Sequence, residues 1–97
     1  MLEFVTQGDR CKLVGELSQQ AVVQHWPKVD GLIGNQVNNL DLSGLIYSDT
    51  AGIALLIHLC GLATQAGRTL TLHSAPAQLQ KLIGLYDLQD FFVEEAQ

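Results

Sequence analysis

The chain has 97 residues, of which 47% are hydrophobic and 15% are charged. This length predicts one domain with one core, and the apolar content excludes an intrinsically disordered chain. The formal net charge is −5, and the five Lys and Arg residues are scattered, which argues against binding to nucleic acid or to anionic lipid.

The first elements read as a β-hairpin. Leu2 to Gln7 is a candidate strand, Gly8-Asp9 is a turn signal, and Arg10 to Val14 is a second candidate strand. We expect Gly15-Glu16-Leu17 to leave the sheet.

A helix should follow, with Ser18 as its N-cap and its body from Gln19 to about Trp26. Pro27 lacks a backbone N–H, so the helix should break or kink there. A second helical piece is expected from Pro27 to Ile33, ending at Gly34-Asn35. Trp26 is interpreted as a core anchor under the first helix.

The middle of the chain reads as a strand from Val37 to Leu42, a polar turn from Ser43 to Asp49, and a long helix from Thr50 to Gln65. Gly67 suits the C-terminal cap of that helix.

Three further elements complete the pattern. Thr69 to His73 is a candidate strand, and Pro76 fits the first turn of a helix that runs to about Tyr86. Phe91 to Val93 forms either a last strand or a segment packed onto the core. A hairpin followed by alternating helices and strands predicts an α/β fold with a mixed β-sheet and helices packed against it, as a single domain over residues 1–97.

No catalytic site is predicted. The sequence has no glycine-rich phosphate loop and no Gly-x-Ser-x-Gly elbow, and His25, His58 and His73 lack metal-ligand spacing. We therefore expect no catalytic residue, no metal and no cofactor. Cys11 and Cys60 read as free core residues of a cytoplasmic protein, and no apolar stretch is long enough to cross a membrane.

The helix that begins at Thr50 is more apolar than one core-facing side requires. On a helical wheel its apolar residues, Ile57 included, cover roughly 220°, whereas a helix on a sheet needs only somewhat over 100°. The remaining narrow strip is uncharged and carries Thr50, Ala54, His58, Gly61 and Gln65. This strip indicates a protein-docking surface. The alternative is a helix packed by the sheet on one side and by the helix after Pro76 on another.

The start of this helix carries hydroxyls and an acid. Ser48 or Asp49 can cap it by accepting a hydrogen bond from a free backbone N–H. Thr50 should then expose its hydroxyl beside the cap. A phosphate on Thr50 would lie at the positive end of the helix dipole, although Asp49 would repel it. The alternative is a capping turn with no further role.

The order of these elements and the sequence Asp49-Thr50-Ala51-Gly52 resemble the STAS domain, which anti-sigma-factor antagonists share with the tails of sulfate transporters. In the antagonists the turn reads Asp-Ser-Ser-Gly-Leu-Gly, and its first Ser is phosphorylated by a partner kinase. Thr50 falls on that position, while Ala51 and Ala54 replace the second Ser and the second Gly.

A closer resemblance, over nearly the whole chain, is to the stand-alone STAS subunits of the Mla phospholipid-transport ABC systems. The matching residues are Gly15-Glu16-Leu17, Trp26, Asp41-Leu42-Ser43, Asp49-Thr50-x-Gly52, Ala54-Leu55-Leu56, His58-Leu59 and Leu85-Tyr86-Asp87-Leu88.

The resemblance implies a cytoplasmic subunit, peripheral on the inner membrane through its complex, that binds the ATPase subunit of the transporter. The permease and substrate-binding subunits belong to the same complex, which maintains the lipid asymmetry of the outer membrane. In that family the residue at the position of Thr50 lies in the surface that meets the ATPase. The expected partner-binding residues are Ser48, Asp49, Thr50, Ala51, Ala54, His58 and Gly61.

Three hypotheses therefore stand. The first is a non-enzymatic regulatory subunit that docks on an ATPase. The second is a partner switch of the anti-sigma-factor-antagonist type, controlled by phosphorylation of Thr50. The third, an enzyme or small-ligand binder, has no supporting residue pattern.

Overall fold

The computed structural model describes residues 2–34, 36–86 and 92–93. Its elements in chain order are β1 (Leu2–Gln7), β2 (Arg10–Leu17), α1 (Gln19–His25), the 3-10 helix η1 (Trp26–Gly31), β3 (Asn39–Ser48), α2 (Thr50–Gln65), β4 (Thr71–His73), α3 (Ala77–Leu85) and β5 (Phe92–Val93).

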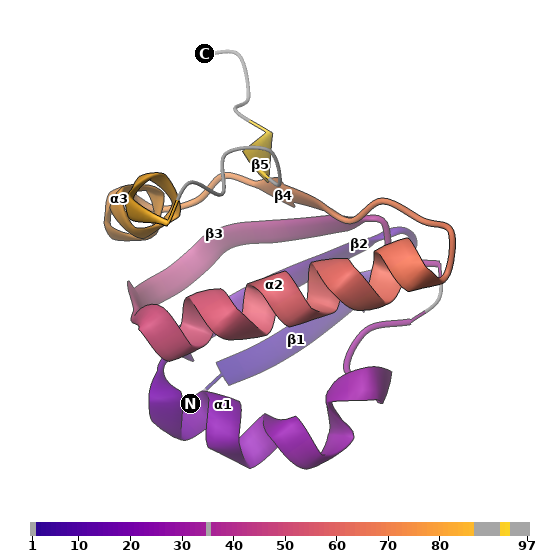
Figure 1. Cartoon of the computed structure of the whole chain (residues 1–97), viewed down its shortest axis with the longest axis horizontal. Helices are drawn as coiled ribbons and strands as arrows, with labels where there is room; N and C mark the ends of the chain where they lie inside the picture. The colour runs from indigo at the N-terminus through magenta and orange to yellow at the C-terminus, as the bar shows by residue number, and fades with distance from the viewer. Residues whose placement is uncertain (1, 35, 87–91, 94–97) are drawn as a thin grey trace.

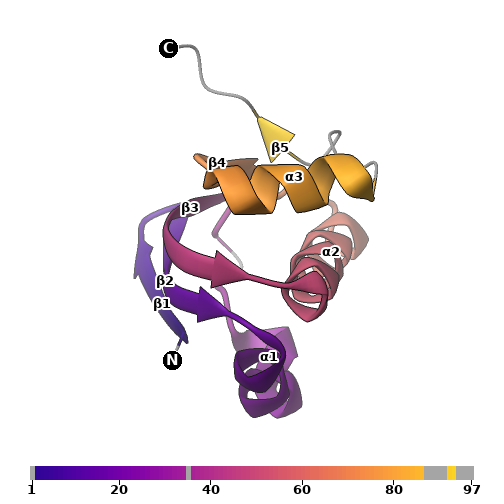
Figure 2. The same cartoon turned by 90° about the vertical axis from the view of Figure 1, so that its left-hand side faces the viewer.

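Within these residues the strands form one mixed sheet in the order β1-β2-β3-β4-β5 (Figure 1). The hairpin strands β1 and β2 are antiparallel, and β2, β3, β4 and β5 are parallel neighbours. Parallel neighbours need crossover connections, which α1 with η1, α2 and α3 provide. The α-helices of the described residues all lie on the same side of the sheet, and none of them covers its other face (Figure 2). The predicted mixed α/β architecture is confirmed.

The core lies between this sheet and α2. Strand residues alternate between the two faces of a sheet except at irregularities, so side chains on one face of β2 and β3 point toward the helices. The largest fully buried side chains include Leu13 of β2, Leu40 and Leu42 of β3, and Leu55 and Leu59 of α2. The long helix is therefore fixed to the sheet by interlocking leucines.

Two strands are longer than the sequence indicated. Gly15 to Leu17 continue β2 instead of leaving the sheet, and Ser43 to Ser48 continue β3 instead of forming a turn. The pairing of the two strands shifts register between Lys12 and Val14 and again between Gly15 and Glu16. Because of these irregularities, the glycines and polar residues that resemble turn residues in the sequence remain within the two paired strands.

The helices agree more closely with expectation. Ser18 caps α1, because its hydroxyl accepts a hydrogen bond from the backbone N–H of Ala21 at 3.3 Å. Pro27 ends the α-helical geometry, and the predicted second piece is the 3-10 helix η1. The predicted bounds of α2, Thr50 and Gln65, are those of the structure. Phe91 lies outside the described residues, and of the two alternatives given for the segment up to Val93, the strand is present as β5.

Candidate functional site

The start of α2 is held by Asp49, the residue between β3 and α2. Its Oδ1 accepts a hydrogen bond from the backbone N–H of Gly52 at 3.1 Å. Its Oδ2 accepts one from the backbone N–H of Gln19, the first residue of α1, at 2.9 Å. The backbone N–H of Asp49 itself donates to the carbonyl of Leu17 at 3.2 Å. Of the two predicted capping candidates, Ser48 and Asp49, the structure selects Asp49.

Gly52 is required by the close approach of α2 to β2. A Cβ at this position would lie 2.4 Å from the carbonyl oxygen of Leu17 and 2.5 Å from its Cγ. Neither distance is possible in a packed interior, so any side chain would push the helix away from the strand. Gly52 therefore lets the first turn of α2 lie directly on the end of β2.

The residues around Asp49 differ in exposure. Ser48 is buried, and its backbone N–H donates to Oε1 of Gln78 in α3 at 3.1 Å. Thr50 is exposed, and Ala51 is half-buried. Of the two hydroxyls that flank Asp49, the one on Thr50 is therefore accessible to a partner or a kinase.

One face of α2 remains exposed along the whole helix, and we name it the α2 strip. Its residues are Thr50, Ala54, Ile57, Gly61, Thr64 and Gln65. They recur at helical spacing, so they share one side of the helix. The strip carries no charged residue, although a solvent-facing helix surface usually does. Ile57 was placed in the wide apolar arc and not in the uncharged strip, and 42% of it is exposed.

Gly61 leaves the middle of the strip without a side chain. A Cβ built there would meet no atom within 4 Å, so the fold itself does not require a glycine. Glycine inside a helix is about 1 kcal/mol less favourable than alanine. Its presence exposes bare backbone, to which a partner can approach closely.

His58 lies at the border of the strip and faces η1. Its imidazole ring packs against the indole of Trp26, with ring centroids 4.8 Å apart. Its Nε2 is enclosed, lacks a hydrogen bond among the described residues, and lies 3.8 Å from Oδ1 of Asp30. The interpretation of Trp26 as a core anchor is wrong, since 43% of the residue is exposed. Trp26 continues α1 with helical backbone angles, φ −57° and ψ −41°, and its indole leaves that helix end to pack over His58 of α2.

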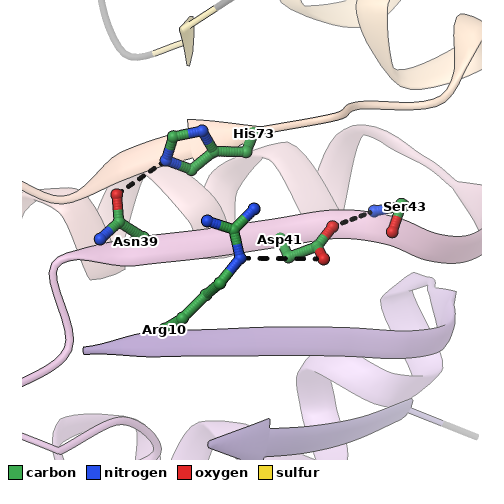
Figure 3. Close-up of polar contacts among 5 residues, drawn as sticks. All are labelled: Arg10, Asn39, Asp41, Ser43 and His73. Carbon is green, nitrogen blue, oxygen red and sulfur yellow. Dashed lines mark hydrogen bonds and ion pairs between the residues drawn. The ribbon is translucent and has the colours of Figure 1, made fainter. Parts of the chain in front are cut away.

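The uncovered sheet face carries a polar cluster instead of an apolar strip (Figure 3). Oδ1 of Asp41 accepts a hydrogen bond from the backbone N–H of Ser43 at 3.0 Å, and Oδ2 lies 4.0 Å from Nε of Arg10. Nε2 of His73 is hydrogen-bonded to Oδ1 of Asn39 at 2.7 Å. Mutually paired polar groups are typical of the solvated face of a sheet. We assign this cluster to stability.

The ionisation of Asp41 follows from its neighbours. Partial burial acts to raise the pKa of this carboxyl, but the hydrogen bonds from Ser43 and the charges of Arg10 and Lys12 outweigh it. The pKa of Asp41 therefore lies below its usual value of 3.8. The carboxylate is stabilised in its charged form by the fold.

Cys11 and Cys60 are free and buried, as predicted. Burial raises the pKa of the Cys60 thiol to about 11. Burial also raises the pKa of Cys11, and a side-chain hydrogen bond with Thr6 offsets only part of that shift. A protonated thiol is a poor nucleophile, so neither cysteine is placed for covalent catalysis.

Histidines and acids do not gather into a metal site in the part of the chain that the structure describes. His25 is hydrogen-bonded to the carbonyl of Leu2 at 3.2 Å, and His58 and His73 have the separate neighbours given above. No helix of the described residues has the length and apolar character needed to span a membrane.

Comparison with known proteins agrees with this architecture. The model of the family described as "Mlab, STAS domain" matches residues 1–94 of the chain. The chain belongs to this family. It is 33% identical over 87 residues to the intermembrane phospholipid transport system binding protein MlaB of Escherichia coli (strain K12), and the match covers 90% of this chain and 89% of that protein. The protein of the same name from Shigella flexneri matches to the same extent.

Two solved structures show the same fold. The anti-sigma factor antagonist SpoIIAA in its unphosphorylated form aligns with a TM-score of 0.75 at 16% identity, over 100% of this chain and 90% of that one. The Bacillus cell fate determinant SpoIIAA in its phosphorylated form aligns with a TM-score of 0.68 at 16% identity, over 100% and 93%. The predicted STAS-like fold is confirmed.

The structure gives the predicted partner-binding residues different positions. Thr50, Ala54 and Gly61 lie on the α2 strip, and His58 borders it. Ala51 is half-buried and Ser48 is buried, whereas Asp49 caps α2 and also accepts a hydrogen bond from the first residue of α1. Sequence reasoning left the exposed residues Ile57 and Trp26 out of the predicted partner-binding set. The spacing of seven between Thr50 and Ile57 was the available signal for one of them.

Proposed function

We propose that this chain is a non-enzymatic regulatory subunit of an ABC transport system for phospholipids, and that it binds the ATPase subunit of that system. Membership of the MlaB STAS family supports the assignment to phospholipid transport. The single observation that carries the docking role is the exposed, uncharged α2 strip beside the half-exposed Trp26.

The composition of this surface suits a protein partner. Thr50, Ala54 and Gly61 are small, so a helix or a backbone segment can approach closely. Trp26 and Ile57 supply large apolar side chains, and buried aromatic side chains often dominate the binding energy of an interface. Because the strip itself is uncharged, docking buries no charge of α2, and the desolvation cost stays low.

A docked subunit can regulate an ATPase through selective binding. If the chain binds the assembled, active conformation better than the inactive one, it shifts the population by the ratio of the two affinities. Moving such an equilibrium from 1:99 to 99:1 requires a ratio of about 10,000. No chemistry by the subunit itself is needed. The subunit would lie on the cytoplasmic side of the inner membrane, held there by its complex of ATPase, permease and substrate-binding subunits, and would contribute to outer-membrane lipid asymmetry.

Co-purification from the native cells tests this proposal. A tagged wild-type chain should recover an ABC ATPase and its permease in fixed ratio, and the Thr50→Glu variant should recover much less. Negative charge in the first turn favours a helix, so this substitution should not unfold the domain. Thr69→Glu is the matched control, because Thr69 is exposed and lies outside α2. Recovery of the ATPase by Thr50→Glu at wild-type yield would disprove docking through the strip.

A second candidate function, a phosphorylation-controlled partner switch, is favoured by one observation. Thr50 is exposed at the start of a helix of 16 residues, where the dipole attracts a phosphate. The Asp49 carboxylate already occupies the backbone N–H of Gly52 and would repel that phosphate. Intact-mass measurement of protein from its native cells decides the matter. A fraction heavier by one phosphate, absent in Thr50→Ala, would support the switch.

A further inference from the structure

Two helices begin at one carboxylate. The first backbone N–H groups of a helix have no partner within the helix, and a side-chain acceptor usually serves one helix. Asp49 serves two, with Oδ1 on Gly52 of α2 and Oδ2 on Gln19 of α1. The two helices start at the same end of the sheet and run side by side (Figure 1).

Helix α1 has little packing of its own to fix its position. It has seven residues, and Ala21 is its one buried residue. Two side-chain contacts hold its C-terminal end. His25 is hydrogen-bonded to the carbonyl of Leu2, and the ring of Trp26 packs against that of His58 in α2. At its N-terminal end the bond between Gln19 and Asp49 joins it directly to the start of α2.

We propose that Asp49 is a positioning residue, which holds α1 and η1 in the orientation that places Trp26 beside the α2 strip. In this role Asp49 does not touch the partner. Without Asp49, the short helix α1 would be free to move away from α2. With Asp49, the two helices together form one docking surface. This inference rests on the proposed docking function for its binding consequence, but its structural consequence can be measured on the chain alone.

Two substitutions remove the same hydrogen bond from opposite sides. Asn is as good an N-cap as Asp, so Asp49→Asn keeps an oxygen for Gly52 and turns an NH2 group toward the N–H of Gln19. Gln19→Pro removes the donor instead. Proline fits the first position of a helix, and Ser18 before it already has the extended conformation that proline requires, with φ −106° and ψ 166°.

The first readout uses the isolated chain. Trp26 is its one tryptophan, so its fluorescence reports the position of η1 against α2. Both variants should make Trp26 more accessible to acrylamide quenching and shift its emission to longer wavelength. Gln20→Ala, which changes the neighbouring exposed residue, should change neither. If both Asp49→Asn and Gln19→Pro leave quenching at the wild-type level, Asp49 does not position Trp26 and the proposal is overturned.

The second readout is a double-mutant cycle for binding to the purified ATPase subunit. Asp49→Asn should weaken binding roughly tenfold, and the same change should have little effect once Trp26 is replaced by Ala, since coupled residues are non-additive. Additive effects would overturn the positioning role. If the wild-type chain does not bind the ATPase at all, the proposed function fails, and the fluorescence result still decides whether Asp49 positions Trp26.

Discussion

The indole of Trp26 lies over the imidazole of His58, with ring centroids 4.8 Å apart and the ring planes inclined at 43°. This tilted ring contact joins η1 to the middle of α2 and leaves 43% of Trp26 exposed. We therefore expect Trp26→Ala to weaken ATPase binding by about tenfold or more, as truncation of an interface tryptophan does. Titration of the purified ATPase subunit measures the effect.

Val5 provides the matched control for this substitution, because it is a similarly exposed apolar residue on the uncovered sheet face. Val5→Ala should leave binding at the wild-type level. Equal losses in the two variants would show that general loss of apolar surface, and not the position of Trp26, controls binding.

Gly52 and Gly61 should respond in opposite directions to the same substitution. Gly52→Ala forces a Cβ against Leu17 and should lower the free energy of unfolding by about 2–4 kcal/mol. Gly61→Ala meets no neighbouring atom and should raise it by up to about 1 kcal/mol. Urea unfolding of both variants tests the pair. A neutral Gly52→Ala variant would contradict the close approach of α2 to β2.

The lowered pKa of Asp41 should make the free energy of unfolding depend on pH. Its pKa is lower in the folded chain than the usual 3.8, so its contribution is fully present above that value and is lost as the pH falls through the folded pKa. Wild type should thus be more stable than Asp41→Asn at pH 7, and the difference should shrink as the pH falls below 3.8 and through the folded pKa. Thermal unfolding of both proteins across this range provides the measurement. A difference that grows on acidification has the wrong sign for this account.

The cysteines should be unreactive in the folded chain. Burial raises the pKa of Cys60 to about 11, and access to both thiols requires the domain to open. Alkylation at pH 8 should therefore proceed at the rate of opening and become fast in denaturant. Destabilising variants such as Gly52→Ala should label faster than wild type. Rapid labelling of Cys60 in the stable wild-type chain would contradict its placement in the core.

The parts of the fold that sequence predicts well are those with a local physical signal. The bounds of α2 follow from a capping acid, a long apolar periodicity and Gly67 after the last turn. The length of β3 cannot be predicted in this way. Gly44 and Ser48 are residue types that favour turns, but pairing with β2 keeps them in the sheet. Tertiary pairing overrides local preference there.

The candidate site shows the same division. The exposed positions of Thr50, Ala54 and Gly61 are recoverable from a helical wheel. The exposure of Trp26 cannot be read from the sequence, since tryptophan is usually well buried and the ring contact of Trp26 is with His58, far away in the chain. The second bond of Asp49 joins residues 30 positions apart in sequence, and no local pattern signals it.

The most direct test of the central claim measures binding of wild type and Gly61→Glu to the purified ATPase subunit. Gly61 has open space around it, so the fold should accept the new side chain, while the middle of the proposed docking surface gains bulk and charge. Gln7→Glu, on the uncovered sheet face, controls for added charge. We predict that Gly61→Glu abolishes binding without lowering thermal stability, since Glu is a better helix former than Gly, and that Gln7→Glu binds like wild type. Wild-type affinity in Gly61→Glu would show that the α2 strip is not the docking surface.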